Sequence, residues 1–150
     1  MSQFDPNQFL DMQVTESNDT KVIPPPVGEY LAVVDDVKVR SWQSKTDSSK
    51  AGLALDVVWS IQDAQVLADL GREKVTVKQG VMLDLTEQGG LDMGKGKNVS
   101  LGRLREATGH NEPGRPFAFG MLMGNMAKIS IAHRIVDEDI FADVKGVAKP

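Results

Sequence analysis

The most regular feature of the chain is an alternation of apolar and polar residues, which is the side-chain period of a β-strand. Residues 29–42 (EYLAVVDDVKVRSW) show it first, and we expect a strand there. One predicted face is apolar and should turn inward; it comprises Leu31, Val33, Val37 and Val39. The other predicted face is more polar and carries Tyr30, Ala32, Val34, Asp36, Lys38, Arg40 and Trp42. The pattern therefore predicts a strand whose outer face bears charges and aromatic rings.

Further strands are predicted from the same alternation, or from apolar runs between turns, over residues 53–62, 73–86, 126–136 and 140–148. In the second strand, Trp59 shares a face with Val57 and Ile61 and should belong to the core. In the fourth strand, His133 and Ile135 fall on the inward face, where a histidine is more often structural than a ligand. The phenylalanines of the C-terminal half are expected in the core; they are Phe117, Phe119 and Phe141.

Two short segments have the spacing of helices. Residues 63–70 are preceded by Asp63, a good N-cap, and followed by Gly71, which favours a helix end. Residues 98–108 begin at Asn98, another candidate N-cap. The buried stripe of this second helix is expected to comprise Val99, Leu101 and Leu104.

These elements indicate a mainly β protein with one or two short helices. Five strands with a helix between the third and the fourth match a small five-stranded Greek-key barrel, and the oligonucleotide-binding (OB) fold is the common barrel with that arrangement. An antiparallel sheet or a sandwich carrying one helix is the alternative, because strand order cannot be read from periodicity.

The length of 150 residues, 41% of them hydrophobic, fits a single domain. Residues 1–27 are predicted to be an acidic N-terminal arm that ends in Pro24, Pro25 and Pro26, and residues 28–150 the folded domain. Apolar residues of the arm are candidates for docking it onto the domain or onto another subunit, and the second case would make a homo-oligomer; they are Phe4, Phe9, Leu10 and Met12.

The formal net charge of −4 argues against a protein that coats DNA by bulk charge. All of this excess lies in residues 1–20, which hold Asp5, Asp11, Glu16 and Asp19 and no Lys or Arg. In the rest of the chain 17 acidic residues balance 17 basic ones. The net charge therefore does not exclude a local basic groove. The acidic arm could compete with DNA for such a groove or recruit a partner.

Catalytic chemistry finds little support in the sequence. There is no Cys, which excludes disulfides, a thiolate nucleophile and Cys-ligated metal sites, and there are only two His residues. Residues 89–95 have the G-x-x-x-x-G-K spacing of a phosphate-binding loop, but Gly96 stands where magnesium binding needs Ser or Thr. We expect no enzyme activity and no cofactor; a small nucleotide-dependent enzyme is the hypothesis that this loop alone would support.

Neither a membrane span nor a signal peptide is expected. No apolar run approaches the roughly 18 residues that a membrane helix needs. The N-terminus lacks the basic start and apolar core of a secretion signal. We therefore expect a cytoplasmic protein without a membrane partner.

The outer strand faces suggest a different chemistry, because a groove for single strands needs cations for phosphates and flat rings for bases. Trp42 is the sharpest candidate, since it ends a strand beside Arg40 and Lys45. Aspartates at positions 36, 56 and 84 fall on the same faces and would repel phosphate. The predicted nucleic-acid-binding residues are Tyr30, Lys38, Arg40, Trp42, Lys45, Lys74, Lys78, Lys95, Lys97, Lys128 and Arg134.

The chain also resembles a known group of proteins. The run PVGEY at residues 26–30, the segment NVSLGRLREATG and the closing LMGNMAKISIAHR followed by DIFADVKGVAK are similar to small phage and prophage proteins of recombination and replication gene clusters. The resemblance covers about residues 26–149 and implies a single-stranded DNA-binding protein with an OB barrel, working in the bacterial host cytoplasm. It supplies no binding motif from which residues can be carried over. Many bacterial single-strand binders end in an acidic tail, whereas this chain has its acidic segment at the front.

The expected function is non-catalytic, largely sequence-independent binding of single-stranded DNA in phage replication or recombination. Phage or host replication and recombination proteins are the expected protein partners. The alternative is a phage structural or assembly protein, a virion component or adaptor, for which the Phe-containing arm and the neutral body are suited.

Overall fold

The computed structural model describes residues 5–150, so that the candidate docking residue Phe4 lies outside the described range. In chain order the helices and strands are α1 (Pro6–Phe9), β1 (Gly28–Gln43), β2 (Ala51–Ile61), α2 (Ala64–Leu70), β3 (Thr76–Met82), α3 (Val99–Ala107), the 3₁₀-helix η1 (Phe119–Leu122), β4 (Met126–Val136) and β5 (Asp139–Ala148).

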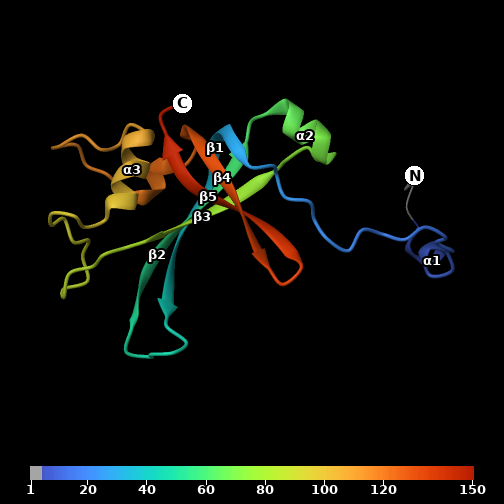
Figure 1. Cartoon of the computed structure of the whole chain (residues 1–150), viewed down its shortest axis with the longest axis horizontal. Coiled ribbons are helices and arrows are strands. Elements are labelled where there is room, and N and C mark those ends of the chain that lie inside the picture. The colour runs from blue at the N-terminus through green and yellow to red at the C-terminus, as the bar shows by residue number, and fades with distance from the viewer. Residues whose placement is uncertain (1–4) are drawn as a thin grey trace.

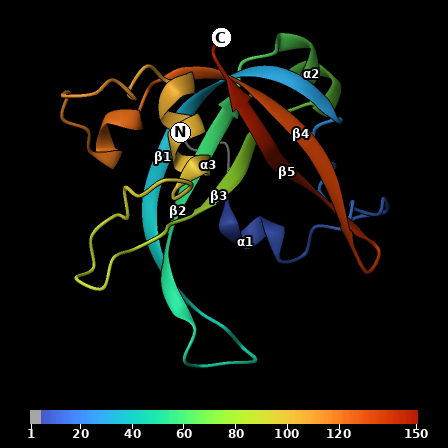
Figure 2. The same ribbon diagram turned by 60° about the vertical axis from the view of Figure 1, so that its left-hand side comes forward.

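The five strands form one antiparallel sheet in the order β3-β2-β1-β4-β5. Its two edge strands, β3 and β5, approach each other, so the sheet is strongly curved. The hairpins β1–β2 and β4–β5 project from one end of the sheet, while α2 and α3 lie at the other end (Figures 1 and 2). The prediction of a mainly β protein with five strands is confirmed; in addition to the two predicted helices, residues 5–150 contain the short helices α1 and η1.

The core lies inside the curved sheet and under α3. Trp59 is fully buried there, as predicted, and its Nε1 donates a hydrogen bond of 2.8 Å to Oε1 of Gln79. Leu101 and Leu104 of α3 pack into the same cluster. One polar partner for the indole N–H and apolar contacts elsewhere are what a buried tryptophan requires.

A β-bulge in β1 corrects the predicted face of this strand. Val34 pairs with Trp59 and Asp36 with Val58, so Asp35 has no counterpart on β2. The extra residue reverses the alternation. Before the bulge, Ala32 and Val34 are therefore buried although they were predicted to face outward. The predicted inward residue Leu31 is 40% exposed instead.

Further residues predicted to face inward are exposed instead; among them are Val39, which is 50% exposed, His133, Ile135 and Val99. Ile135 is 71% exposed because it lies in the part of the β4–β5 hairpin that projects beyond the core. Val99, at the first turn of α3, is 47% exposed, and the buried stripe of this helix continues to Ala107 instead. For Ile135 and Val99 the periodicity is right and the burial is limited by where the element ends.

The helix ends follow local sequence rules with one exception. Oδ1 of Asp63 accepts hydrogen bonds from the N–H groups of Gln65 and Val66 and so caps α2, and Gly71 ends the helix at a φ of +64°. Asn98 precedes α3 but makes no capping bond. Its side chain instead donates to the backbone oxygen of Asp84 at 2.8 Å, which fastens the loop before α3. No helix within residues 5–150 is long and apolar enough to cross a membrane.

Candidate nucleic-acid interface

An open groove of about 390 Å³ lies between the β4–β5 hairpin and the outer face of β1, β2 and β3. Three predicted binding residues line it, one from each of three strands: Arg40, Lys78 and Arg134. The remaining lining residues are Asp56, Gly80, Phe141, Ala142 and Asp143. The groove therefore combines three cations, two carboxylates and one aromatic ring.

Strand register explains why these residues meet. Lys38 pairs with Asp56 and Arg40 with Ala54. Because paired residues lie on the same face of a sheet, the side chains of Lys38, Arg40 and Asp56 share one face. On β3, Lys78 is opposite Val58, which places its side chain diagonally next to Asp56. Neighbours of this kind lie within reach of long side chains.

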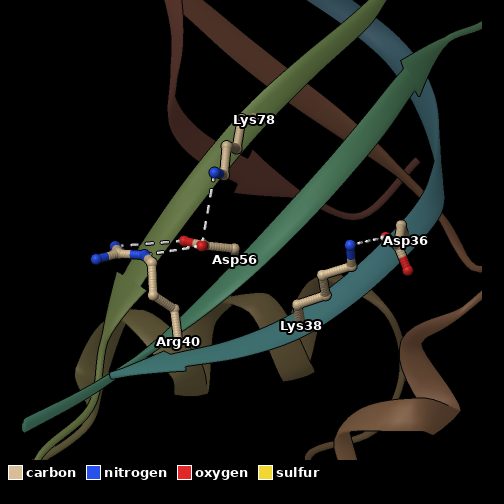
Figure 3. Close-up of polar contacts among 5 residues, drawn as sticks. All are labelled: Asp36, Lys38, Arg40, Asp56 and Lys78. Carbon is tan, nitrogen blue, oxygen red and sulfur yellow. Dashed lines mark hydrogen bonds and ion pairs between the residues drawn. The ribbon is translucent and has the colours of Figure 1, made fainter. Parts of the chain in front are cut away.

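The wall formed by β1, β2 and β3 is organised around Asp56. Its Oδ2 lies 2.9 Å from Nε of Arg40 and 3.6 Å from Nζ of Lys78, and the carboxylate sits between the two cations (Figure 3). Asp56 is 7% exposed. The hydrogen bond from Arg40, with the charge of Lys78, holds the pKa of Asp56 below its usual value. One buried carboxylate thus orients two exposed cations and leaves them a single net positive charge.

The opposite wall carries a second arginine and a ring. Nε of Arg134 lies 2.8 Å from Oδ2 of Asp143, and this contact raises the pKa of the guanidinium. The same guanidinium lies over the ring of Phe141, 5.0 Å from its centroid. Phe141 is 43% exposed, so the prediction that it belongs to the core is wrong. Planar groups of both kinds are suitable surfaces for stacking bases.

Trp42 lies on the same face of β1, two residues beyond Arg40, and its partner across the strands is Gly52. A Cβ atom at position 52 would lie 3.1 Å from Nε1 of Trp42, so the indole rests across the glycine backbone. The tryptophan is partly exposed, yet its Nε1 is buried and has no hydrogen-bond partner among the described residues. The indole of Trp42 therefore occupies the space on β2 that a side chain at position 52 would fill.

Two more of the predicted lysines form ion pairs outside the groove. Nζ of Lys38 lies 3.7 Å from Asp36, and Figure 3 shows this pair separate from the contacts of Asp56. Lys74 lies 2.7 Å from Asp35, the bulge residue. The predicted weakness of the surface is therefore real for Asp36 and Asp56, which pair with its cations, whereas Asp84 lies in the loop before α3 and bonds to Asn98.

The bulge also removes Tyr30 from the predicted surface. Tyr30 precedes the bulge, packs against the core, and donates a hydrogen bond of 2.9 Å from its hydroxyl to the backbone oxygen of Pro26. Burial, followed by the charge of Asp63, raises the pKa of this hydroxyl. The prediction of Tyr30 as an outward stacking ring is wrong.

The other predicted lysines are not gathered at the groove. Lys45 is in the exposed turn of the β1–β2 hairpin, and Lys128 lies on β4 opposite Leu31. Lys95 and Lys97 belong to the loop between β3 and α3. In Figures 1 and 2 this loop lies on the other side of β2 from the β4–β5 hairpin.

The glycine-rich loop has acidic groups where a phosphate-binding loop would need free N–H groups. Oδ1 of Asp92 accepts the N–H of Gly94 at 2.9 Å. Oδ2 of Asp84 accepts the N–H of Asn98, the residue that precedes α3, at 2.8 Å. Both N–H groups are thus occupied by carboxylates, and the loop gives no geometric support for nucleotide binding.

Five lining residues of the groove were not among the predicted site residues: Asp56, Gly80, Phe141, Ala142 and Asp143. Phe141 was assigned to the core, and Asp143 was not considered. The signal that could have found them is the acidic turn DED at residues 137–139 between two long strands, which indicates a projecting hairpin whose faces are both exposed. No protein-family model matches this sequence, and no curated protein matches it either.

Proposed function

We propose that this protein binds single-stranded DNA without catalysis and largely without sequence preference, in phage DNA replication or recombination in the bacterial cytoplasm. The observation that carries the proposal is the groove, in which Arg40, Lys78 and Arg134 meet the exposed ring of Phe141. Cations for the backbone and rings for the bases are the two requirements of sequence-tolerant binding.

The strand arrangement supports an OB barrel as the framework of this site. In the chain, α3 lies between β3 and β4, and the edges β3 and β5 close towards each other. OB folds bind oligonucleotides on the outer face around their second and third strands, flanked by the loops that join strands one to two and four to five. The position of Asp56 on β2 and of Lys78 on β3 in the groove supports this comparison.

The paired cations predict how binding would work. A phosphate at Arg40 or Lys78 has to share these side chains with Asp56, and one at Arg134 has to share with Asp143. The electrostatic gain is therefore small, and stacking on Phe141 and Trp42 must supply much of the affinity, at about 1–3 kcal/mol for each stacked base. We infer moderate affinity and weak salt dependence.

The proposal is tested by electrophoretic mobility shift with matched single- and double-stranded oligonucleotides at low salt. We expect a shift of the single strand by the wild-type protein, and a weaker shift by Arg134→Ala. Lys128→Ala, a change of charge on the same strand outside the groove, should behave as wild type. Equal binding of both DNA forms, or binding that Arg134→Ala does not change, would contradict the proposal that the groove binds single-stranded DNA.

A phage structural or assembly protein is the second candidate, and the arm favours it. Phe9, Leu10, Met12 and Val14 are exposed by 56%, 84%, 54% and 71%, respectively, and an apolar segment of this kind suits a protein partner, either a replication protein or a second copy. Mass spectrometry of purified virions separates the two candidates. Abundant copies in the particle would favour the structural role, and their absence the DNA-binding role.

A further inference from the structure

A second cleft, of about 600 Å³, opens beside the groove. It lies between the edge strands β3 and β5 and a segment of the arm, residues 20–26, which we call the strap. This seam cleft shares Lys78, Phe141 and Ala142 with the groove. The two therefore form one continuous surface that runs from β1, β2 and β3 onto the seam of the sheet.

The cleft exists because the sheet does not close by pairing. Among the described strands β3 is bonded only to β2 and β5 only to β4, although the two edges approach each other. Edge strands are usually protected by a covering segment. Here the strap passes beside the seam and leaves a space next to Thr76 on β3 and Ile140 on β5.

The strap is fastened along its length to the folded domain. Lys21 donates from Nζ to the backbone oxygen of Glu138 at 3.0 Å, and Arg72 donates to the backbone oxygen of Ile23 at 2.6 Å. Nε2 of His133 lies 2.7 Å from the backbone oxygen of Pro25, which is buried. The contacts of Arg72 and His133 use the backbone of the strap, so they hold its position while Ile23 remains 66% exposed.

The chemistry of the seam cleft resembles that of the groove. Ile23, Pro24 and Ile140 give it apolar surfaces, and Lys78 and Arg72 bring positive charge. Arg72 has no ion-pair partner in the described part of the chain, in contrast to the arginines of the groove. The acidic residues of the cleft are Glu138, in the turn of the β4–β5 hairpin, and Asp139, at the start of β5; Lys21 pairs with Asp139 at 3.6 Å.

We propose that single-stranded DNA bound in the groove continues into the seam cleft, where the strap holds it as a clamp. Bases would pack against Phe141, Ile23 and Pro24, and Arg72 would take a phosphate. This inference rests on the proposed function and extends the DNA footprint from the groove to the seam.

The charge of the strap favours a segment that holds DNA over one that blocks the DNA site. Residues 20–26 contain one lysine and no Asp or Glu, so the wall they form does not repel phosphate. The acidic part of the arm precedes the strap, and none of its carboxylates within residues 5–19 pairs with a cation of the groove. An acidic segment that blocks the DNA site would be expected to form such pairs.

The test compares oligo-dT of about 4 and about 16 nucleotides, the range that a single OB barrel covers. Ile23→Asp places a carboxylate in the seam cleft at an exposed position and should leave folding unchanged. We expect it to weaken binding of the long oligonucleotide about tenfold while the short one binds as to wild type. Arg40→Ala, in the groove, should weaken both. Val14→Asp, the matched charge change on the arm outside the cleft, should change neither.

Each outcome decides the inference. If Ile23→Asp binds the long oligonucleotide as well as wild type, or more tightly, the strap is not a clamp. Weaker binding by Arg40→Ala would in that case still support the groove as the DNA site. If the wild-type protein binds neither oligonucleotide, the proposed function fails together with the inference.

Discussion

Arg40 on β1 donates a hydrogen bond of 2.9 Å to Asp56 on β2, and the carboxylate that receives it is 7% exposed while the arginine remains largely accessible. The pair fixes the position of a cation at the edge of the groove and, in the same contact, neutralises it. The balance between these two effects decides how strongly this surface can bind a phosphate.

Replacing this carboxylate by an amide should strengthen DNA binding. In Asp56→Asn the groove gains one net positive charge, because Arg40 and Lys78 lose their shared anion. We expect oligo-dT affinity to rise about three- to tenfold at low salt. Fluorescence anisotropy of a labelled oligonucleotide measures it, and unchanged or weaker binding by a folded variant would show that Asp56 orients the cations more than it neutralises them.

The same substitution should make the protein less stable in a pH-dependent way. The pKa of Asp56 is lower in the folded protein than in the unfolded chain, because Arg40 binds its charged form. Its stabilisation is therefore fully present above the unfolded pKa of about 4 and is lost as the pH falls through the folded value. Because Arg40 is solvent-accessible, the effect should be about 1 kcal/mol or less.

Urea unfolding of wild type and Asp56→Asn between about pH 6 and pH 2.5 measures this effect, since the window spans the unfolded pKa of aspartate. The difference in unfolding free energy should shrink as the pH falls. A difference that stays constant across the window would mean that the charge of Asp56 contributes nothing to stability.

The two tryptophans should respond in opposite ways to truncation. Trp59→Ala removes a fully buried ring and leaves Gln79 without its partner, so we expect a loss of about 3–5 kcal/mol in the free energy of unfolding. Trp42→Ala should cost much less stability and should weaken oligo-dT binding about tenfold. Denaturation and binding curves of both variants check this, with Trp42→Phe as a control that keeps a flat ring. Unchanged binding by Trp42→Ala would show that the Trp42 ring does not stack on a base.

Gly52 should be needed for the position of the Trp42 ring. A methyl group at position 52 would lie 3.1 Å from Nε1 of Trp42, so the indole must move away from the strand in Gly52→Ala. We predict a red-shifted Trp42 emission and weaker DNA binding with a folded core. Gly146→Ala is the matched control, because Gly146 lies outside the groove and a Cβ there meets only Ser130 at 3.8 Å. Identical emission from wild type and Gly52→Ala would contradict the proposed packing.

The sequence predicts the elements of this fold well because each of them follows from a local rule. Alternation locates β4 at its observed ends, residues 126–136, and Asp63 and Gly71 define α2. The error on the first half of β1 has a single cause, the extra residue Asp35, and no local signal marks where a bulge interrupts an alternating strand. That one residue moves Ala32 and Val34 into the core.

The candidate site was less predictable, because it depends on contacts between strands. Arg40 and Lys78 were identified from strand faces, but their common partner Asp56 follows only from the register of β1, β2 and β3. Phe141 is exposed because its hairpin projects beyond the core, which is a matter of how far two strands extend past their neighbours. Burial therefore could not be inferred from residue type there.

The most direct test of the central claim is a titration of tryptophan fluorescence with oligo-dT at several salt concentrations. We predict quenching of Trp42 and an affinity that falls with salt, with a slope of log K against log salt no steeper than about −3, the value for four phosphate contacts at Arg40, Lys78, Arg134 and Arg72. Double-stranded DNA of the same length should quench far less. Absence of quenching and of binding by single strands at low salt would contradict the account.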